Sequence, residues 1–332
     1  MAVFVNTNYS ALQGQRYLGN VQNQLTTTYQ RLSSGMRINS AKDDAAGLQI
    51  ADRLTSQING LNQGNRNASD GIALAQTMEA GMDEISGMLQ KMRTLTVQAS
   101  NGTNTQSDRD ALAKEMSSLA TEVNRIAMKT TFAGKTILNG QSKDTSSLFG
   151  QDKTNGSDKG AAGSDGTMTL QVGSNKGDTI SFNATSVMFS KLNAPGDPIM
   201  KEGDGIFQTN KDTGAVVVKL SKADFSNQGN DNYIGNVIDM FDKMLATVDG
   251  QRADLGAIQN RLESSIRNQS NVAANEADAR SRIRDADFAE ESANLSQQSI
   301  IQQAAASMLM QANTRPQPVS YTHLTLPTIR LV

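Results

Sequence analysis

Residues 292–314 read SANLSQQSIIQQAAASMLMQANT, a stretch without one charged side chain. A helix on the surface of a globular protein normally carries charges on its outer face. Here uncharged Gln, Asn, Ser and Thr take their place, so we expect both faces of the helix to lie against protein. The apolar residues that fall close to one helical stripe are Leu295, Ile301, Ala305, Met308 and Ala312.

The other end of the chain is built in the same way. Residues 1–30 carry a single charged side chain, Arg16. Apolar residues recur here with the three-and-four spacing of a helical seam, at Leu18, Val21, Leu25 and Leu32. Since both ends lack the charges of a solvated helix, we predict that they serve assembly.

The composition limits the functions that the chain can have. Only 4% of the 332 residues are aromatic and none is Trp, which favours long, narrow helical packing over a large globular core. The 31 basic and 33 acidic side chains nearly balance, whereas general nucleic-acid binding needs a concentrated basic surface. There is no cysteine to form a thiolate metal site or a disulfide. No window approaches the roughly 20 apolar residues of a membrane span, and the N-terminus lacks the pattern of a cleaved signal peptide. We therefore expect no cofactor, no nucleic acid and no membrane insertion, and export by another route if the protein leaves the cell.

Long helices are permitted over most of the chain, because proline is absent from residues 1–194 and 199–315. Ser40 and Asp43 have the spacing of a capping box, which predicts a second helix with acidic residues in its first turn. At about 55 residues this helix would be roughly 80 Å long. The helices predicted after the first begin near Ala41, after Ser107 and near Ile234.

The centre of the chain has another character. Residues 141–166 are rich in Gly, Ser, Asp and Lys, which predicts a flexible insertion. Alternating patterns predict a hairpin formed by residues 168–172 and 179–182, and a further strand at 215–220. Together the patterns predict a mainly α fold: a long antiparallel helical bundle or coiled coil formed by both chain ends, with a β-hairpin and a small irregular or β central insert.

Several strings of residues carry a resemblance to a known family. Residues 32–47, LSSGMRINSAKDDAAG, closely resemble the N-terminal signature of bacterial flagellins. Residues 280–289, RSRIRDADFA, and residues 303–307, QAAAS, resemble the C-terminal signature, while residues 170–173 with 177–180 resemble the hairpin of the family. The resemblance covers roughly residues 1–140, 167–182 and 233–319.

The resemblance implies a secreted, non-catalytic structural subunit that assembles into the extracellular filament of the bacterial flagellum and supports motility. The implied inner layer of the filament would pack through Leu18, Val21, Leu25, Leu32, Leu295, Ile301 and Met308. The implied divisions are inner-core helices at 1–40 and 280–319, outer-core helices at 41–140 and 233–279, the flexible insertion 141–166, the outer-core hairpin 167–182 and a variable exposed subdomain at 183–232.

The resemblance also implies partners. These are further copies of the chain, a flagellar export chaperone acting with type III export, the filament cap and hook-filament junction proteins, and a host Toll-like receptor. The receptor contacts implied by position are Lys91, Leu95, Gln98 and Glu115. Lys91 stands where strongly sensed flagellins usually have arginine, and because lysine lacks the planar fork of donors we predict weaker recognition. The alternative interpretation is that these four residues make filament contacts only.

The sequence argues against three other classes of function. Some flagellins carry a zinc peptidase in the central insert, but this needs His-Glu-x-x-His and the one histidine, His323, lies outside the insert. A hook-filament junction protein shares the terminal coiled coils but not usually this complete set of signatures. A membrane-active helix needs a cationic face, which the uncharged ends lack. Four methionines at helical spacing predict core packing rather than a metal site: Met78, Met82, Met88 and Met92.

The final residues, 320–332, break the helical seam and contain the single histidine. We interpret this atypical tail as a sequencing, frameshift or fusion artefact. The alternative is a genuine variant end that faces the lumen of the filament.

Overall fold

A computed structural model describes residues 8–140, 147–149, 166–192, 199, 205–209, 215–226, 229 and 233–314. The chain divides into two compact units. The terminal unit consists of residues 1–58 and 273–332, and the central unit of residues 59–272. Apart from 147–149 and 166, the expected insertion at 141–166 lies outside the described residues, and so does the whole tail at 320–332.

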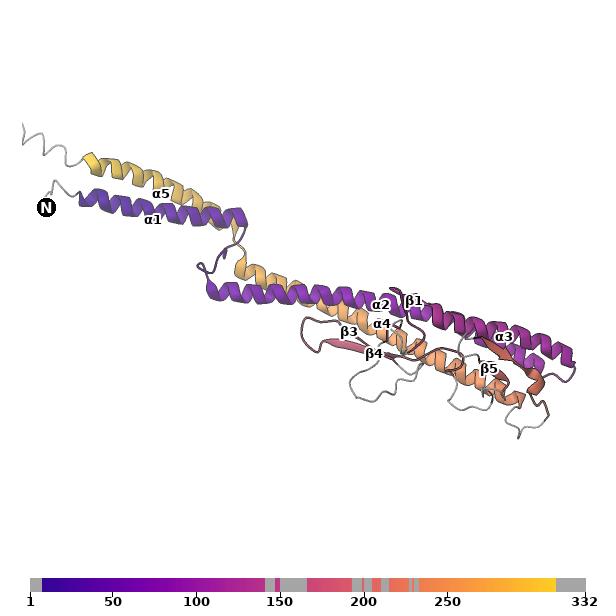
Figure 1. Cartoon of the computed structure of the whole chain (residues 1–332). Coiled ribbons are helices and arrows are strands. Elements are labelled where there is room, and N and C mark those ends of the chain that lie inside the picture. Colours follow the sequence, from indigo (N-terminus) through magenta and orange to yellow (C-terminus); the bar gives the residue numbers. More distant parts are fainter. Residues whose placement is uncertain are drawn as a thin grey trace, which may run out of the picture. The chain divides into compact units, whose positions relative to one another are not determined.

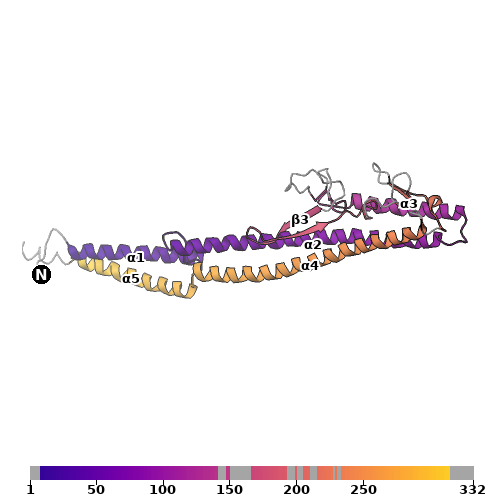
Figure 2. The same cartoon turned by 90° about the horizontal axis from the view of Figure 1, so that it is seen from below.

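The terminal unit contains a pair of helices from opposite ends of the chain. Helix α1 (Tyr9–Ser34) and helix α5 (Phe288–Thr314) lie side by side (Figures 1 and 2). The side chain of Asn8 caps α1, because its Oδ1 accepts a 3.1 Å hydrogen bond from the amide of Ala11. Gly35 ends α1 in the left-handed conformation that glycine favours, with φ at 70°. The pairing of the two chain ends, predicted from their seams, is thus present in the structure.

The second helix, α2 (Ala45–Ala99), has the expected 55 residues but begins later than predicted. The predicted capping box at Ser40 is wrong, since Asp43 instead closes a turn by accepting the amide of Ser40 at 2.9 Å. The cap is Asp44, whose Oδ1 accepts a 2.9 Å hydrogen bond from the amide of Gly47. Asp43 and Asp44 therefore precede the helix and do not lie in its first turn.

Three helices form the core of the central unit: α2, α3 (Gln106–Lys129) and α4 (Ile234–Arg284). Thr105 and Asp108 form a reciprocal capping box at the start of α3, two residues before the predicted start. The prediction that the methionines fill the core is confirmed for Met78, Met82 and Met92, and Met88 packs at its margin. None of the helices in the described residues has both the length and the apolar character that a membrane span needs.

Short antiparallel strands complete the central unit. The predicted hairpin is confirmed as β3 (Gly166–Gln171) and β4 (Thr179–Ala184), with Leu170 opposite Ile180. The turn between its strands begins directly on the backbone of α2, where a methyl group added at Gly64 would collide with the carbonyl oxygen of Val172. The remaining elements are β1 (Thr131–Phe132), β2 (Lys135–Thr136), β5 (Phe207–Thr209), β6 (Val216–Val218) and the short 3-10 helix η3 (Leu220–Lys222). β6 falls within the strand predicted at 215–220, while its partner β5 was not predicted.

Candidate assembly surface

Helices α1 and α5 meet along a seam with coiled-coil spacing. On α1 the half-buried and buried positions advance by alternating steps of three and four: Ala11, Gly14, Leu18, Val21, Leu25, Thr28 and Leu32. On α5 the matching positions are Glu291, Leu295, Gln298, Gln302, Ala305, Leu309 and Ala312. Because this repeat keeps one face of each helix toward the other, the pair packs as a two-stranded coiled coil within the chain.

The seam is fixed by contacts of three kinds. Near the N-terminal end of α1, a methyl group added at Gly14 would lie only 3.2 Å from Cδ1 of Leu309, so the glycine makes room for that side chain. In the middle, Thr28 donates a 3.1 Å hydrogen bond to Oε1 of Gln298. Near the C-terminal end of α1, Arg31 forms a 3.1 Å ion pair with Glu291, which is only 7% exposed. Polar pairs within an apolar seam set the register of two helices, since a slip would leave them unpartnered.

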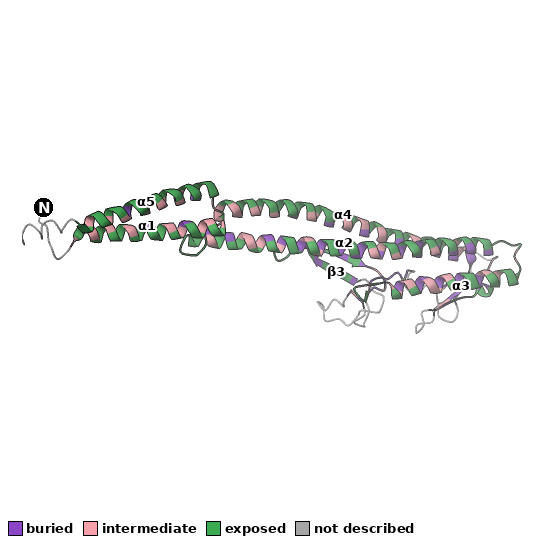
Figure 3. Cartoon of the chain, turned by 90° about the horizontal axis from the view of Figure 1, so that it is seen from above, coloured by how far each residue is buried: buried purple, intermediate pink, exposed green. Residues whose placement is uncertain are grey.

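The sides of α1 and α5 that face away from the seam carry large apolar side chains. Figure 3 shows exposed ribbon over most of both helices, whereas α2 and α3 carry buried stretches. Eight of the twelve large apolar side chains that are exposed in the described residues belong to this pair: Tyr9, Leu12, Tyr17, Tyr29, Phe288, Ile300, Met308 and Met310. We call these eight residues the outer apolar set.

The outer apolar set does not lie on one side of the pair. Ile300 is 66% exposed and precedes Leu309 by about two and a half turns, so it projects opposite to the seam. A helix that is apolar on several sides is stable only when several sides are covered. Exposed apolar residues standing singly need no explanation, but a concentration on two helices marks an interaction surface. Packing α1 on α5 covers one side of each helix. The remaining apolar sides are suited to contacts with other protein molecules.

Most of the residues predicted for inner packing lie at the seam. Val21 is 4% exposed, and Leu18, Leu25, Leu32, Leu295 and Ile301 are half-buried. Met308 is the exception: it is 67% exposed and does not lie at the seam of the single chain, while its packing inside a filament stays a prediction. The seam steps from Ala305 to Leu309, one residue beyond Met308, and three-and-four spacing alone allows either residue.

The predicted receptor residues lie on α2 and α3 of the central unit. Nζ of Lys91 lies 3.5 Å from Oε1 of Glu115, with both side chains about half exposed. Gln98 is exposed as well. Leu95 is only 4% exposed, which contradicts a role as a direct surface contact. It belongs to the buried stripe that includes Met92 and Ala99. It therefore packs under the exposed residues Lys91, Gln98 and Glu115.

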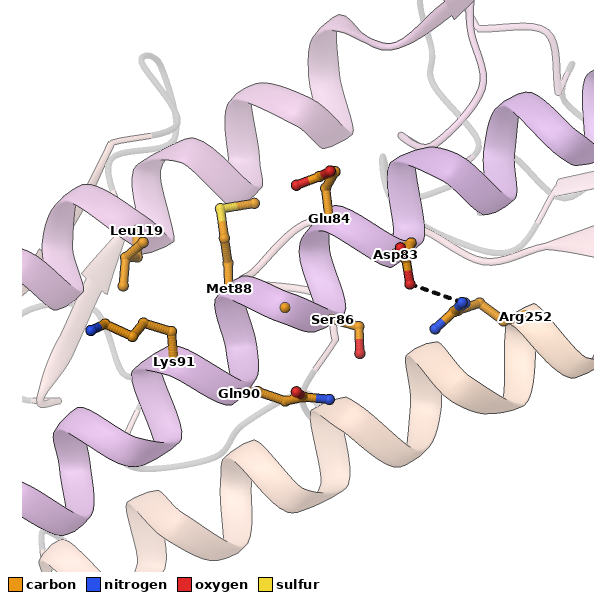
Figure 4. A pocket seen from close by; sticks show the side chains of 9 residues that line it. Asp83, Glu84, Ser86, Met88, Gln90, Lys91, Leu119 and Arg252 are labelled. Carbon is orange, nitrogen blue, oxygen red and sulfur yellow. Dashed lines mark ion pairs between the residues drawn. The ribbon is translucent and has the colours of Figure 1, made fainter.

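A hollow of about 490 Å³ lies beside Lys91, between α2, α3 and α4 (Figure 4). Its charged lining consists of Glu84, Lys91 and an ion pair in which Arg252 lies 2.9 Å from Asp83. Met88 and Leu119 supply its apolar wall. Among the described residues, His, Cys, Asp and Glu form no group of three that could hold a metal ion. The hollow thus combines charged side chains of both signs with a small apolar wall.

The sequence and the fold of the chain are similar to those of known proteins. Residues 5–143 match the bacterial flagellin N-terminal helical region, and residues 238–321 match the bacterial flagellin C-terminal helical region. Flagellin A of Vibrio cholerae is 36% identical over 394 residues, covering 95% of this chain and 98% of that protein. Flagellin A of Vibrio anguillarum is 38% identical over 375 residues, with the same coverage. In fold alone, the chain is similar to a flagellar hook-associated protein from Vibrio parahaemolyticus, with a TM-score of 0.53 and 16% identity over 73% of this chain and all of that one.

Proposed function

Because the chain belongs to the bacterial flagellin family, the structural subunits of the flagellar filament, we propose that α1 and α5 form the inner layer of that filament. The family is structural and not enzymatic, and its members polymerise with copies of themselves. The observation that supports the proposed layer is the outer apolar set, which α1 and α5 leave exposed in the single chain.

The proposal assigns the inner layer to residues 1–40 and 280–319, and the outer layer to 41–140, 167–182 and 233–279. The seam residues Leu18, Val21, Leu25, Leu32 and Leu295, with Ile301 beside the seam, would hold the two helices of each copy together. Met308 would contact neighbouring copies instead, because it faces away from the seam. Residues 183–232 would lie on the outside of the filament as the variable subdomain.

We also propose that the free subunit is secreted by type III export with its C-terminal helix held by a chaperone. α5 needs such cover, because Ile300, Met308 and Met310 are each about two-thirds exposed in the single chain. The filament cap and hook-filament junction proteins are proposed to use the same terminal helices at the ends of the filament.

A host Toll-like receptor is the last proposed partner. Lys91, Gln98 and Glu115 provide an exposed surface for it, with Leu95 as a buried support. In receptor-reporter cells, Glu115→Ala should lower signalling by roughly tenfold, as expected for a lost charged contact, while Glu122→Ala on the same helix serves as control. Equal signalling by both variants would leave these residues as filament contacts only.

Seeded polymerisation tests the proposed function. The full-length chain and a variant that ends at Val319 would be added to fragmented flagellar filaments and followed by electron microscopy and sedimentation. Extension of the seeds is the expected result, and extension by the shorter variant alone would identify residues 320–332 as foreign. If neither extends the seeds while both bind hook-junction proteins in a fixed ratio, the chain acts as a junction protein instead.

A further inference from the structure

Two methionines of α5 stand apart from the buried methionines of the central unit. Met308 is 67% exposed and Met310 is 66% exposed. Leu309 lies between them and packs against α1 at Gly14. Successive residues of a helix are about 100° apart, so the two thioethers project on either side of the seam and away from it. Met78, Met82, Met92, Met116, Met240 and Met244 are by contrast at most 1% exposed.

We propose that Met308 and Met310 are oxidation sites, and that their oxidation by a peroxide blocks assembly of the free subunit. The inference rests on the proposed function, in which this side of α5 packs against neighbouring copies. In the reaction a lone pair of the thioether sulfur attacks one peroxide oxygen, and the O–O bond breaks as the S–O bond forms. The hydroxide that leaves takes the remaining proton and becomes water. The sulfur is oxidised by two electrons to the sulfoxide, and hydrogen peroxide is reduced.

The product is incompatible with the surface that carries it. A sulfoxide converts a flexible apolar side chain into a polar one with a strong acceptor oxygen. Residues 292–314 contain no charged donor, and the neighbours Leu309 and Ala306 are apolar. The hydroxyl of Ser307 already donates to the carbonyl of Gln303, which leaves the amide of Gln311 as the nearby uncharged donor. Burying the new oxygen against such a surface without a hydrogen bond is unfavourable. The free subunit would therefore lose its ability to add to a filament.

The same geometry makes the modification depend on assembly. In the single chain both methionines are about two-thirds exposed, while Leu309 between them packs against α1 at Gly14. Once neighbouring copies cover the other sides, a peroxide no longer reaches the thioethers. Oxidation would thus act on subunits that have not yet been incorporated and would spare those in the filament.

The test uses the full-length chain and dilute hydrogen peroxide. Peptide mass mapping should show Met308 and Met310 of the free chain oxidised at least roughly tenfold faster than Met78 and Met82. The critical concentration for extending seeds should then rise by roughly tenfold. The oxidised double variant Met308→Leu with Met310→Leu should stay within about twofold of the untreated chain, since leucine cannot be oxidised in this way. Methionine sulfoxide reductases should restore assembly of the oxidised chain.

The matched control is the double variant Met78→Leu with Met82→Leu, which keeps both α5 methionines and should lose assembly on oxidation as the unaltered chain does. If the oxidised α5 double variant loses assembly equally, the damage lies elsewhere and the inference is overturned. Unimpaired assembly of the oxidised, unaltered chain would also overturn it. Failure of even the untreated chain to extend seeds would instead overturn the proposed function.

Discussion

The amide of Phe189 donates a 2.8 Å hydrogen bond to Oδ1 of Asn124, a side chain only 2% exposed on α3. Two further bonds of this kind lie within the described residues. Oγ1 of Thr121 accepts from the amide of Val216 at 3.1 Å, and Oγ of Ser117 accepts from the amide of Val218 at 2.8 Å. Since residues 117, 121 and 124 share one helical face, α3 offers the central segments a row of acceptors in the way that a neighbouring strand would.

Asn124→Ala should destabilise the central unit by about 1–3 kcal/mol, because it leaves a buried backbone amide without its acceptor. Urea unfolding followed by circular dichroism measures the change, and hydrogen exchange of the Phe189 amide localises it. Ser118→Ala, on the exposed side of the same helix, should change stability by less than about 0.5 kcal/mol. Equal stability of the two variants would show that the acceptor row does not hold the central segments.

Gly64→Ala should displace the β3–β4 hairpin from α2, since the added methyl group collides with the carbonyl of Val172. We expect a loss of about 1–3 kcal/mol, typical of overpacking. Gly256→Ala provides the matched control, because nothing lies within 4 Å of the added methyl group in the middle of α4. Alanine favours a helix more than glycine, so this change should stabilise by about 0.5–1 kcal/mol. The same sign for both variants would contradict the close packing at Gly64.

The fold could be predicted from the sequence wherever one periodicity governs many residues. The terminal seams, the 55-residue α2 and the β3–β4 hairpin all follow from patterns of three-and-four or of alternation. The start of α2 could not be predicted, because Ser40 with Asp43 satisfies a capping pattern that the chain uses for a turn. Strand β5 has only three residues and no alternation long enough to detect.

The candidate assembly surface was predictable only where a single apolar stripe governs a helix. The seam residues of α1 follow one stripe. Because α5 is apolar on several sides, its sequence does not decide whether Met308 or Leu309 packs at the seam. The burial of Leu95 follows from its spacing of three and four from Met92 and Ala99, whereas its role as a receptor contact was inferred from its position in the family.

Stability of the central unit should fall below pH 4, in part through Asp242. Arg93 donates hydrogen bonds of 2.6 and 3.2 Å to this carboxylate, which lowers its pKa below the ordinary 3.8. The unfolded chain then binds the proton more readily, so the contribution is present above pH 3.8 and is lost as pH falls through the lowered value. Asp242→Asn and Arg93→Gln should each flatten the dependence of the urea midpoint on pH between about 5 and 3. An unchanged slope in both would contradict this contribution.

Glu291→Gln should weaken filament assembly, because it removes the charge that partners Arg31 in the seam between α1 and α5. With Glu291 almost fully buried, we expect a cost of about 1 kcal/mol. The critical concentration for seeded growth would then rise roughly fivefold. Glu290→Gln changes an exposed neighbour on the same helix and should leave assembly unaffected. An equal rise of the critical concentration in both variants would attribute the effect to the loss of net charge and not to the ion pair.

The most direct test of the central account is thiol labelling of the assembled filament, which is straightforward because the chain has no cysteine of its own. Ile300→Cys places a thiol in the outer apolar set, and Val217→Cys places one at the exposed position of strand β6 in the central unit. If α1 and α5 form the inner layer, the thiol from Ile300→Cys should react readily in the free chain and at least roughly tenfold more slowly in filaments, while that from Val217→Cys reacts alike in both. Filaments in which the thiol from Ile300→Cys reacts as fast as in the free chain would contradict the account.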